Sequence, residues 1–303
     1  MFTCKKIEPE TKFGDFTFKL ELQNISDQAK DLAVTDLRET PENVAKGLEE
    51  LRRLLREEEN LILPLESDEW LLGFLRICKF YPEGAKDKIK TYYKYRQRYA
   101  DVFKDGTPKR VKHVFDMSSI LVLPNRDQHG RRIILMRSGK YWDHKRVHKD
   151  EFFLAAALCH EFCRMEPNSQ INGMVAITDL DGLTMEQAMQ FTLNYSKRNV
   201  ESYRDGASFR PKDLHFINEP SIFHKIFNLV RPFIGKKLSK RTHFHGSNMQ
   251  SLHEFISPDS LPECYGGRLK LELNYGPQLY ELMTLFEDDF ENNLKYGFKS
   301  KAK

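Results

Sequence analysis

The most apolar helical pattern of the chain lies between residues 221 and 230. Pro220 precedes it, at a helix start where the missing N–H of proline costs nothing. The apolar face is wider than an ordinary surface helix needs and comprises Ile222, Phe223, Ile226, Phe227, Leu229 and Val230. Pro232 and Gly235 then interrupt the pattern. The stretch predicts a helix that either packs in the core or covers an apolar pocket.

Strand-like and helix-like runs alternate after Gly130. The expected strands cover residues 132–136, 173–177, 214–217 and 242–245. The expected helices cover residues 150–165, 184–203, 219–230 and 248–256. Apolar strands that alternate with helices predict an α/β fold, in which helices cover a mixed, largely parallel sheet.

Helical patterns dominate before Gly130, except that residues 13–22 alternate like one half-buried edge strand. Thr40 and Ser67 are each followed by helix-start residues, and a third helix is expected over residues 85–99. We therefore expect four parts: an N-terminal extension (1–25), a small all-helical domain (26–112), the α/β domain (113–275), and a C-terminal helix with a charged tail (276–303).

The composition is that of a globular protein with room for one large core and a smaller domain. The 303 residues are 40% hydrophobic and 30% charged, and the net charge of +4 gives no general affinity for nucleic acid. No secretory segment opens the chain, and no run reaches the ~18 apolar residues of a membrane-spanning helix. Five scattered cysteines fit a reducing compartment. We expect a cytoplasmic protein with peripheral association to intracellular membranes.

Four motifs resemble the ligand-gate and C-terminal motifs of the CRAL-TRIO lipid-binding family, most closely its α-tocopherol transfer and retinaldehyde-binding branch. The motifs are INEPSIFHKIF (217–227), RPFIGKKLSKR (231–241), HFHGSN (243–248) and LPECYGG (261–267). The resemblance extends from roughly Thr40 to Gly267.

The resemblance implies a monomeric, non-enzymatic carrier that holds one tocopherol-, retinoid- or carotenoid-type molecule under a mobile gate helix and delivers it to phosphoinositide-bearing membranes. A phosphatidylinositol or phosphatidylcholine exchange protein is the alternative within the same fold. An exchanger needs polar groups for a headgroup, whereas the INEP gate favours the carrier.

The helix expected over residues 150–165 carries one stripe in which small alanines leave room for a ligand. By resemblance this helix lines the pocket, and His160 falls where the tocopherol carrier has a hydroxyl-bearing side chain. One polar group in an apolar cavity orients a ligand's hydroxyl or carbonyl, although a hydrogen-bonded core histidine is an open alternative. The expected pocket residues are Phe153, Ala156, Ala157, His160, Met174, Thr178, Phe191, Leu214, Phe223, Ile226, Phe227, Val230 and Phe233.

Basic residues cluster around the gate segment: Arg210, Lys212, Lys236, Lys237, Lys240 and Arg241. Arginine and lysine both suit phosphate, and a solvated basic face is the alternative. The resemblance implies that the phosphoinositide-binding residues are Arg76, Arg210, Lys237 and Arg241. Cys78 departs from the family pattern, which has a further arginine there. No RNA- or DNA-binding motif accompanies the basic residues.

Two other groups suggest chemistry only superficially. Asp179 and Asp181 resemble the start of haloacid-dehalogenase-type phosphatases, a remote alternative; we expect Asp181 to cap the turn into the next helix. Cys159 and Cys163, with His243 and His245, lack the spacing of a closed zinc site. We therefore expect no catalytic residues, no metal and no cofactor.

Overall fold

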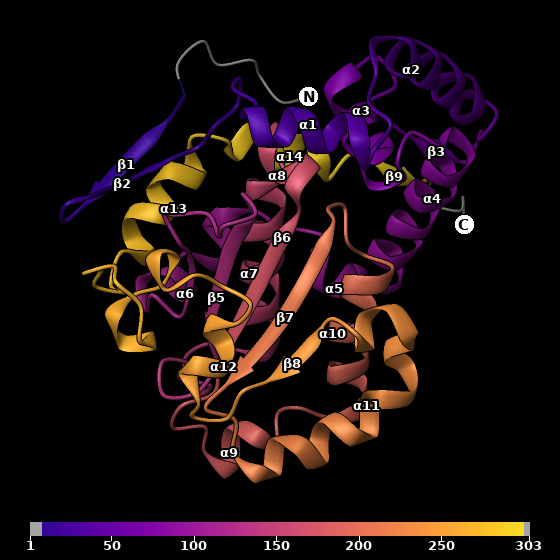
Figure 1. The fold of residues 1–303 in the computed structure, drawn as a ribbon. Coiled ribbons are helices and arrows are strands. Elements are labelled where there is room, and N and C mark those ends of the chain that lie inside the picture. Colours follow the sequence, from indigo (N-terminus) through magenta and orange to yellow (C-terminus); the bar gives the residue numbers. More distant parts are fainter. Residues whose placement is uncertain (1–7, 300–303) are drawn as a thin grey trace.

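The structure is a computed structural model that describes residues 8–299. Five strands form its main sheet in the order β4–β5–β6–β7–β8 (Figure 1). They cover Ile120–Val122, Arg132–Arg137, Met174–Asp179, Pro211–Ile217 and Thr242–Phe244. β4 pairs antiparallel with β5, and the other pairings are parallel. The expected α/β fold with a largely parallel sheet is confirmed, and β4 is the strand of this sheet that the sequence did not predict.

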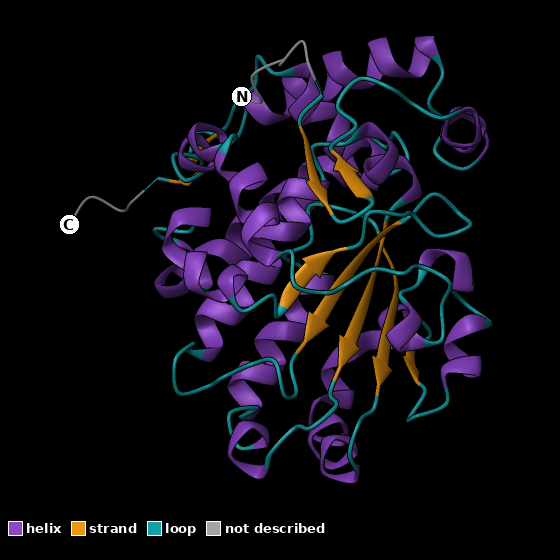
Figure 2. Cartoon of the chain, turned by 90° about the vertical axis from the view of Figure 1, so that its left-hand side faces the viewer, coloured by secondary structure: helices purple, strands orange, loops and turns teal. Residues whose placement is uncertain are grey.

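Helices lie on both sides of this sheet (Figure 2). Those that follow or connect its strands are α7 (Lys149–Cys163), α8 (Pro167–Asn172), α9 (Met185–Ala188), α10 (Leu193–Arg204), α11 (Ser221–Ser239) and α12 (Met249–His253). The single helix expected over 184–203 is wrong, because the Thr192 side chain caps a second helix by accepting the Tyr195 N–H. Buried apolar side chains around α7 and the sheet form the main core.

Two of the N-terminal helices begin directly after Thr40 and Ser67, as the sequence indicated. The helix expected over 85–99 begins three residues earlier, at Pro82, and the other three helices were not predicted. The N-terminal helices are α1 (Asp27–Thr35), α2 (Pro41–Arg56), α3 (Asp68–Ile77), α4 (Pro82–Arg98), α5 (Ala100–Phe103) and α6 (Lys112–Asp116), with a 3-10 turn at Pro108–Val111. Thr40 and Ser67 each accept the backbone N–H three residues ahead, as N-caps do. A second core, around Trp70 and Phe74, joins α2, α3 and α4.

The chain returns to this helical unit at its end. After 3-10 turns at Pro258–Ser260 and Glu263–Tyr265 come α13 (Gly276–Thr284), α14 (Glu287–Asn293) and β9 (Gly297–Phe298). β9 pairs with β3 (Leu61–Ile62), between α2 and α3. The four expected domain boundaries stay predictions, and the expectations for residues 1–7, with Cys4, and 300–303 lie outside the described residues.

The alternating segment near the N-terminus is a hairpin, so the single edge strand expected there is wrong. β1 (Glu10–Phe13) pairs antiparallel with β2 (Phe16–Lys19). Gly14 turns the chain at a φ of +56°, which glycine adopts at little cost. Phe13 stacks on Tyr275 with 3.9 Å between the ring centroids. The hairpin is thereby held against the start of α13.

Candidate functional site: an apolar cavity under α11

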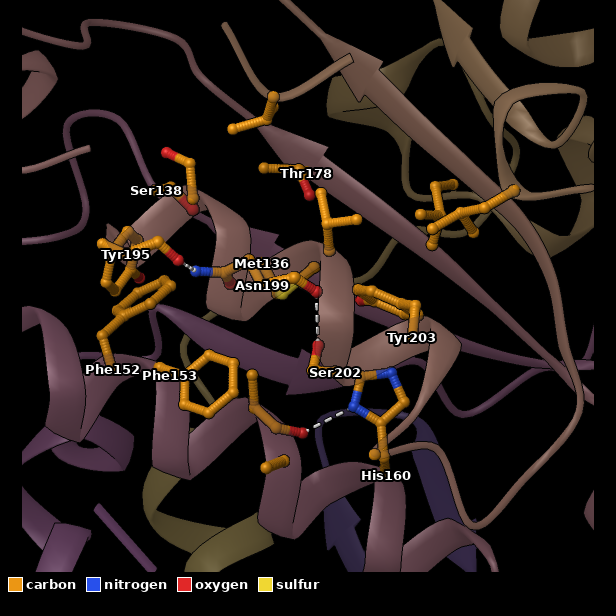
Figure 3. Close-up of a pocket in the computed structure, with 18 of the residues that line it drawn as sticks. Met136, Ser138, Phe152, Phe153, His160, Thr178, Tyr195, Asn199, Ser202 and Tyr203 are labelled. Atoms are coloured by element: carbon orange, nitrogen blue, oxygen red, sulfur yellow. Dashed lines mark hydrogen bonds between the residues drawn. The ribbon is translucent and has the colours of Figure 1, made fainter. Parts of the chain in front are cut away.

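A cavity of about 180 Å³ lies between α7, α10, α11 and the strands β5 to β7. One strand face supplies Met136, Thr178, Leu214 and Phe216, since alternate residues of a strand share a face. Figure 3 shows Phe153 and His160 rising from α7 toward α10 side chains. The lining is predominantly apolar and aromatic, as in sites for hydrophobic small molecules.

Most of the pocket residues expected from the sequence lie together around this cavity. They are Phe153, Ala156, Ala157, His160, Thr178, Phe191, Leu214, Phe223, Ile226, Phe227 and Val230. Ala156 and Ala157 lie beside each other on α7, where larger side chains would extend into the space. α7 and residues 221–230 of α11 therefore face one cavity.

Two expected pocket residues lie elsewhere. Met174 begins β6 and is buried in the main core, at the end of the strand that the cavity does not reach. Phe233 turns outward on α11, where its ring lies 5.2 Å from the Lys197 ammonium. Its neighbour Ile234 takes the inward position. Both expectations are corrected by the direction in which the side chains point.

Sequence reasoning missed the contribution of α10, which carries polar and aromatic groups into the cavity lining. Tyr195, Asn199 and Tyr203 follow one another at intervals of four residues and all line it. That spacing places them on one helix face. This spacing can be read from the sequence, but polar residues on a helix face are typical of a face exposed to solvent.

His160 is a buried, titratable side chain of α7 that lines the cavity. Its ring stacks on Phe209 with 4.5 Å between centroids, and Tyr203 meets it edge-on at 5.7 Å. Nδ1 lies 2.7 Å from the Ala156 carbonyl oxygen. Burial lowers the pKa of His160 to about 4, because the imidazolium would lose its hydration. The imidazole is therefore neutral at pH 7.

A polar group of three side chains lies in the lining where α4 meets α7. Arg96 forms an ion pair with Glu161 at 2.8 Å, and the Tyr92 hydroxyl donates to the same carboxylate at 2.8 Å. The Arg96 guanidinium also lies over the Phe103 ring, 4.9 Å from its centroid. These charges therefore have partners within the protein.

α11 covers the cavity through aromatic contacts. Phe223 lies 5.1 Å from Phe216 between ring centroids, and Phe227 lies 4.7 Å from Phe244. On the outer face of the helix, Leu229 is 63% exposed. The apolar side chains of α11 therefore lie both on its inner face, against the cavity, and on its outer face, at the surface.

The helical path of α11 differs from the expectation. Pro220 is the N-cap rather than a first-turn residue, and the helix continues through Pro232 to Ser239. Its regular geometry breaks at Gly235, with φ +72° and ψ 156°. A left-handed φ suits glycine, and no atom lies within 4 Å of the position a Cβ would occupy. The break separates the apolar part of α11 from its basic end.

The structure brings the basic residues around Gly235 and β7 together. Burial and the nearby charges of Arg241 and Arg210 lower the pKa of Lys237. Lys212 lies on β7, and burial together with the Arg210 charge lowers its pKa to about 8. We call Arg210, Lys212, Lys237 and Arg241 the basic cluster. Arg210 and Arg241 lower the pKa of both lysines, which indicates a concentrated positive potential that an anion would relieve.

Asp36, which directly follows α1, neutralises part of this potential. Asp36 pairs with Arg210 at 2.6 Å and with Lys79. The Lys79 hydrogen bond, and then Arg210, lower the pKa of Asp36 to about 2. Asp36 is therefore ionised at neutral pH and occupies guanidinium donors that a phosphate would use.

Arg76 lies apart from the basic cluster in exposure and partners. Only 6% of the residue is exposed, and its guanidinium donates to Glu39 and Gln170, each at 2.6 Å. A buried arginine with these partners serves the packing of α3 on α8, so we leave Arg76 out of the proposed headgroup residues. Cys78 lies near the Lys88 and Lys237 charges, and burial raises the pKa of its thiol to about 11.

The acidic turn after β6 is held by hydrogen bonds. Asp179 accepts from the Asn218 amide and the Tyr265 hydroxyl, each at 2.8 Å. Asp181 pairs with Lys140 at 2.6 Å, and Thr184 caps α9, so the expectation that Asp181 caps the helix is wrong. Thr184 provides the cap because Gln187 completes a capping box with it.

The cysteines and histidines considered as metal ligands lie in different parts of the structure. Cys159 and Cys163 are buried on α7, whereas His243 and His245 stack with His215 beside Phe255. Among residues 8–299, no group of three or more His, Cys, Asp or Glu side chains can hold a metal ion. Over the same range, no helix combines the length and apolar character needed to cross a membrane.

A largely parallel sheet, an apolar cavity and a covering helix that ends among basic residues together define a lipid-binding α/β domain. The family model described as "CRAL/TRIO domain" matches residues 116–267. Clavesin-2 of Mus musculus is 30% identical over 278 residues, which are 91% of this chain and 84% of the relative. Clavesin-1 of Pongo abelii is 30% identical over 259 residues, which are 84% of this chain and 73% of the relative.

The chain therefore belongs to the CRAL-TRIO family of lipid-binding domains, as its motifs predicted. The crystal structure of Sfh5 is also similar, with a TM-score of 0.46 and 14% identity over 68% of this chain and 75% of that chain. The narrower expectation of the tocopherol and retinaldehyde branch stays a prediction.

Proposed function

We propose that the protein is a carrier of one small hydrophobic molecule, which it holds in the cavity under α11. The observation that carries the proposal is the predominantly apolar lining that α7, α10 and α11 give the cavity. Burial of apolar ligand surface contributes about 25 cal/mol per Å², so a few hundred Å² give tight binding with one or two hydrogen bonds. A tocopherol, retinoid or carotenoid has this character.

The carrier delivers its ligand at phosphoinositide-bearing membranes. α11 provides both the cover of the cavity and, after the break at Gly235, Lys237 of the basic cluster. A headgroup that binds the cluster better when α11 is displaced shifts the population toward the open state. Asp36 opposes this step, because the headgroup must replace it at Arg210.

Two observations favour a carrier over the alternatives. The Arg96 and Glu161 charges in the lining neutralise each other, which leaves less for a phospholipid headgroup in an exchange protein. Asp179, the residue a phosphatase would use as nucleophile, accepts hydrogen bonds that hold the turn. We therefore infer that the protein acts without catalysis.

The test is mass spectrometry of organic extracts from the protein purified out of its native source. A terpenoid, tocopherol or carotenoid at one molecule per chain supports the carrier, and a phospholipid supports exchange. The variant Ala157→Phe fills the cavity from α7 and should lose the ligand. Its circular dichroism should stay unchanged, which serves as the control for folding. An extract identical for both proteins would contradict binding in this cavity.

A further inference from the structure

The hydrogen bond of His160 fixes which ring nitrogen carries the proton. A carbonyl oxygen only accepts hydrogen bonds, so the nitrogen 2.7 Å from the Ala156 oxygen must be the donor. That nitrogen is Nδ1. A neutral imidazole has one N–H, and Nε2 is then a bare acceptor.

The ring stays neutral because its surroundings disfavour the imidazolium. Phe209 covers one face, Tyr203 meets the ring edge-on, and burial lowers the pKa to about 4. The nearest carboxylate along α7, Glu161, is already paired with Arg96 and Tyr92. His160 therefore does not become a donor at both nitrogens near neutral pH.

Nε2 is open toward the cavity. Within residues 8–299 no side chain or backbone group donates to it, and it is not enclosed like the unpaired Nε2 of His215. His160 lines the cavity, and in Figure 3 the ring nitrogen that makes no drawn hydrogen bond points toward Tyr203. An acceptor with no donor in the protein is left for the ligand.

We propose that the cavity selects a ligand with a hydroxyl group, an alcohol or phenol, whose O–H donates to Nε2 of His160. This inference rests on the proposed carrier function and names the class of ligand. An aldehyde, ester or ether of the same skeleton offers only lone pairs to Nε2 and leaves a buried acceptor unsatisfied. The site therefore discriminates by the direction of one hydrogen bond.

Two of the neighbouring polar donors in the lining are already engaged within α10. The Ser202 hydroxyl donates to the Asn199 carbonyl at 2.6 Å, and the Asn199 amide donates to the Tyr195 carbonyl at 2.9 Å. The Tyr203 hydroxyl can both donate and accept, so it accommodates an alcohol and a carbonyl alike. The Asn199 amide oxygen, like Nε2, can only accept, so the His160 variants below decide which of the two acceptors distinguishes an alcohol from a carbonyl.

The test compares probes that share a skeleton and differ only in the oxygen group. Dissociation constants are measured for retinol against retinaldehyde and for α-tocopherol against its methyl ether, with the full chain. The hydroxyl member should bind about fivefold more tightly or better, the factor that corresponds to one net hydrogen bond. Equal affinities within both pairs, or tighter binding of the carbonyl or ether member, would overturn the inference.

Two variants assign the preference to His160. His160→Leu should keep apolar affinity and lose the hydroxyl preference, whereas His160→Gln, whose amide oxygen accepts, should restore part of it. A hydroxyl preference that survives in His160→Leu places the acceptor elsewhere and contradicts the inference. The wild-type tautomer is read independently by long-range proton–nitrogen NMR of labelled histidine, which should show Nε2 without a proton.

The outcomes separate this inference from the function on which it rests. If the probes bind without hydroxyl preference, the carrier stands and the ligand class is wrong. If neither skeleton binds and the native extract holds no hydrophobic ligand, the carrier function itself fails. If NMR shows the proton on Nε2, the ligand class fails whatever binds.

Discussion

At the scale of single residues, the sequence predicted side chains best where local chemistry decides their role. Thr40 and Ser67 act as N-caps because their hydroxyl oxygens accept from N–H groups that the first helical turn leaves unpaired. Asp181 was assigned wrongly, since a lysine distant in sequence, Lys140, provides its partner. The direction of Phe233 also depends on a residue from another helix, Lys197.

Asp179→Asn tests whether the acidic turn is structural or catalytic. The amide keeps the size but cannot accept from both Asn218 and Tyr265 as the carboxylate does, so unfolding free energy should fall by about 1–3 kcal/mol. Ligand affinity at 20 °C should be unchanged, measured by fluorescence titration. A phosphatase activity that the wild type has and this variant lacks would reverse the assignment.

The neutral state of His160 predicts a pH dependence of stability. Its pKa in the fold, about 4, lies below the ordinary value of 6.5, so the unfolded chain takes up the proton first. Stability from this group is complete above pH 6.5 and declines by about 3 kcal/mol as the pH falls to 4. Denaturant titrations should show a shallower decline for His160→Gln; identical pH profiles would contradict a depressed pKa.

At the scale of elements, α11 joins the cavity to the basic cluster, and its sequence revealed both halves. The apolar spacing indicated an inward face, and the lysines after Gly235 indicated a charged end. The sequence did not reveal that Asp36, from the end of α1, already pairs with Arg210. That contact joins residues 174 positions apart, beyond any local pattern.

Ile226→Asp tests the cover of the cavity. Ile226 is half-buried and lines the cavity, so a carboxylate there would lose part of its hydration. Ligand dissociation should accelerate about tenfold or more, equivalent to 1.4 kcal/mol or more. Leu229→Asp adds the same charge to the exposed face of the same helix and should leave dissociation unchanged. Equal acceleration in both variants would show that α11 does not enclose the ligand.

Asp36→Asn tests whether an internal carboxylate competes with the membrane. Removing its charge frees Arg210 and Lys79, so affinity for phosphoinositide vesicles should rise about fivefold, near 1 kcal/mol for one charge. Asp27→Asn removes a charge from the exposed start of the same helix and serves as the control. Co-sedimentation measures both, and unchanged binding of Asp36→Asn would exclude competition at Arg210.

At the scale of the whole molecule, the class of fold was predictable because its strands are long apolar runs separated by helices. β4 escaped notice because it has only three residues, Ile120–Val122, and is defined by its pairing with β5. β9 is likewise defined by its pairing with β3, which lies more than two hundred residues earlier in the chain. The α7 part of the cavity was expected from its small alanines together with the family resemblance, whereas the α10 part required the tertiary packing of polar residues.

The central claim is that membrane phosphoinositide, acting through the basic cluster, opens the cavity beneath α11. The most direct measurement is the rate at which protein carrying fluorescent retinol delivers it to vesicles with and without phosphoinositide at equal total lipid. Delivery should be faster with phosphoinositide, and Arg210→Ala, Lys237→Ala and Arg241→Ala combined should remove the acceleration while retinol affinity without vesicles stays unchanged.

A control variant removes three exposed positive charges elsewhere, at Lys30, Lys46 and Lys112, and should deliver like the wild type. Three charges at about 1 kcal/mol each correspond to roughly a hundredfold or more in vesicle affinity at low salt. The account predicts a phosphoinositide-dependent rate that only the basic-cluster variant loses. Equal rates with and without phosphoinositide, or full acceleration in that variant, would contradict it.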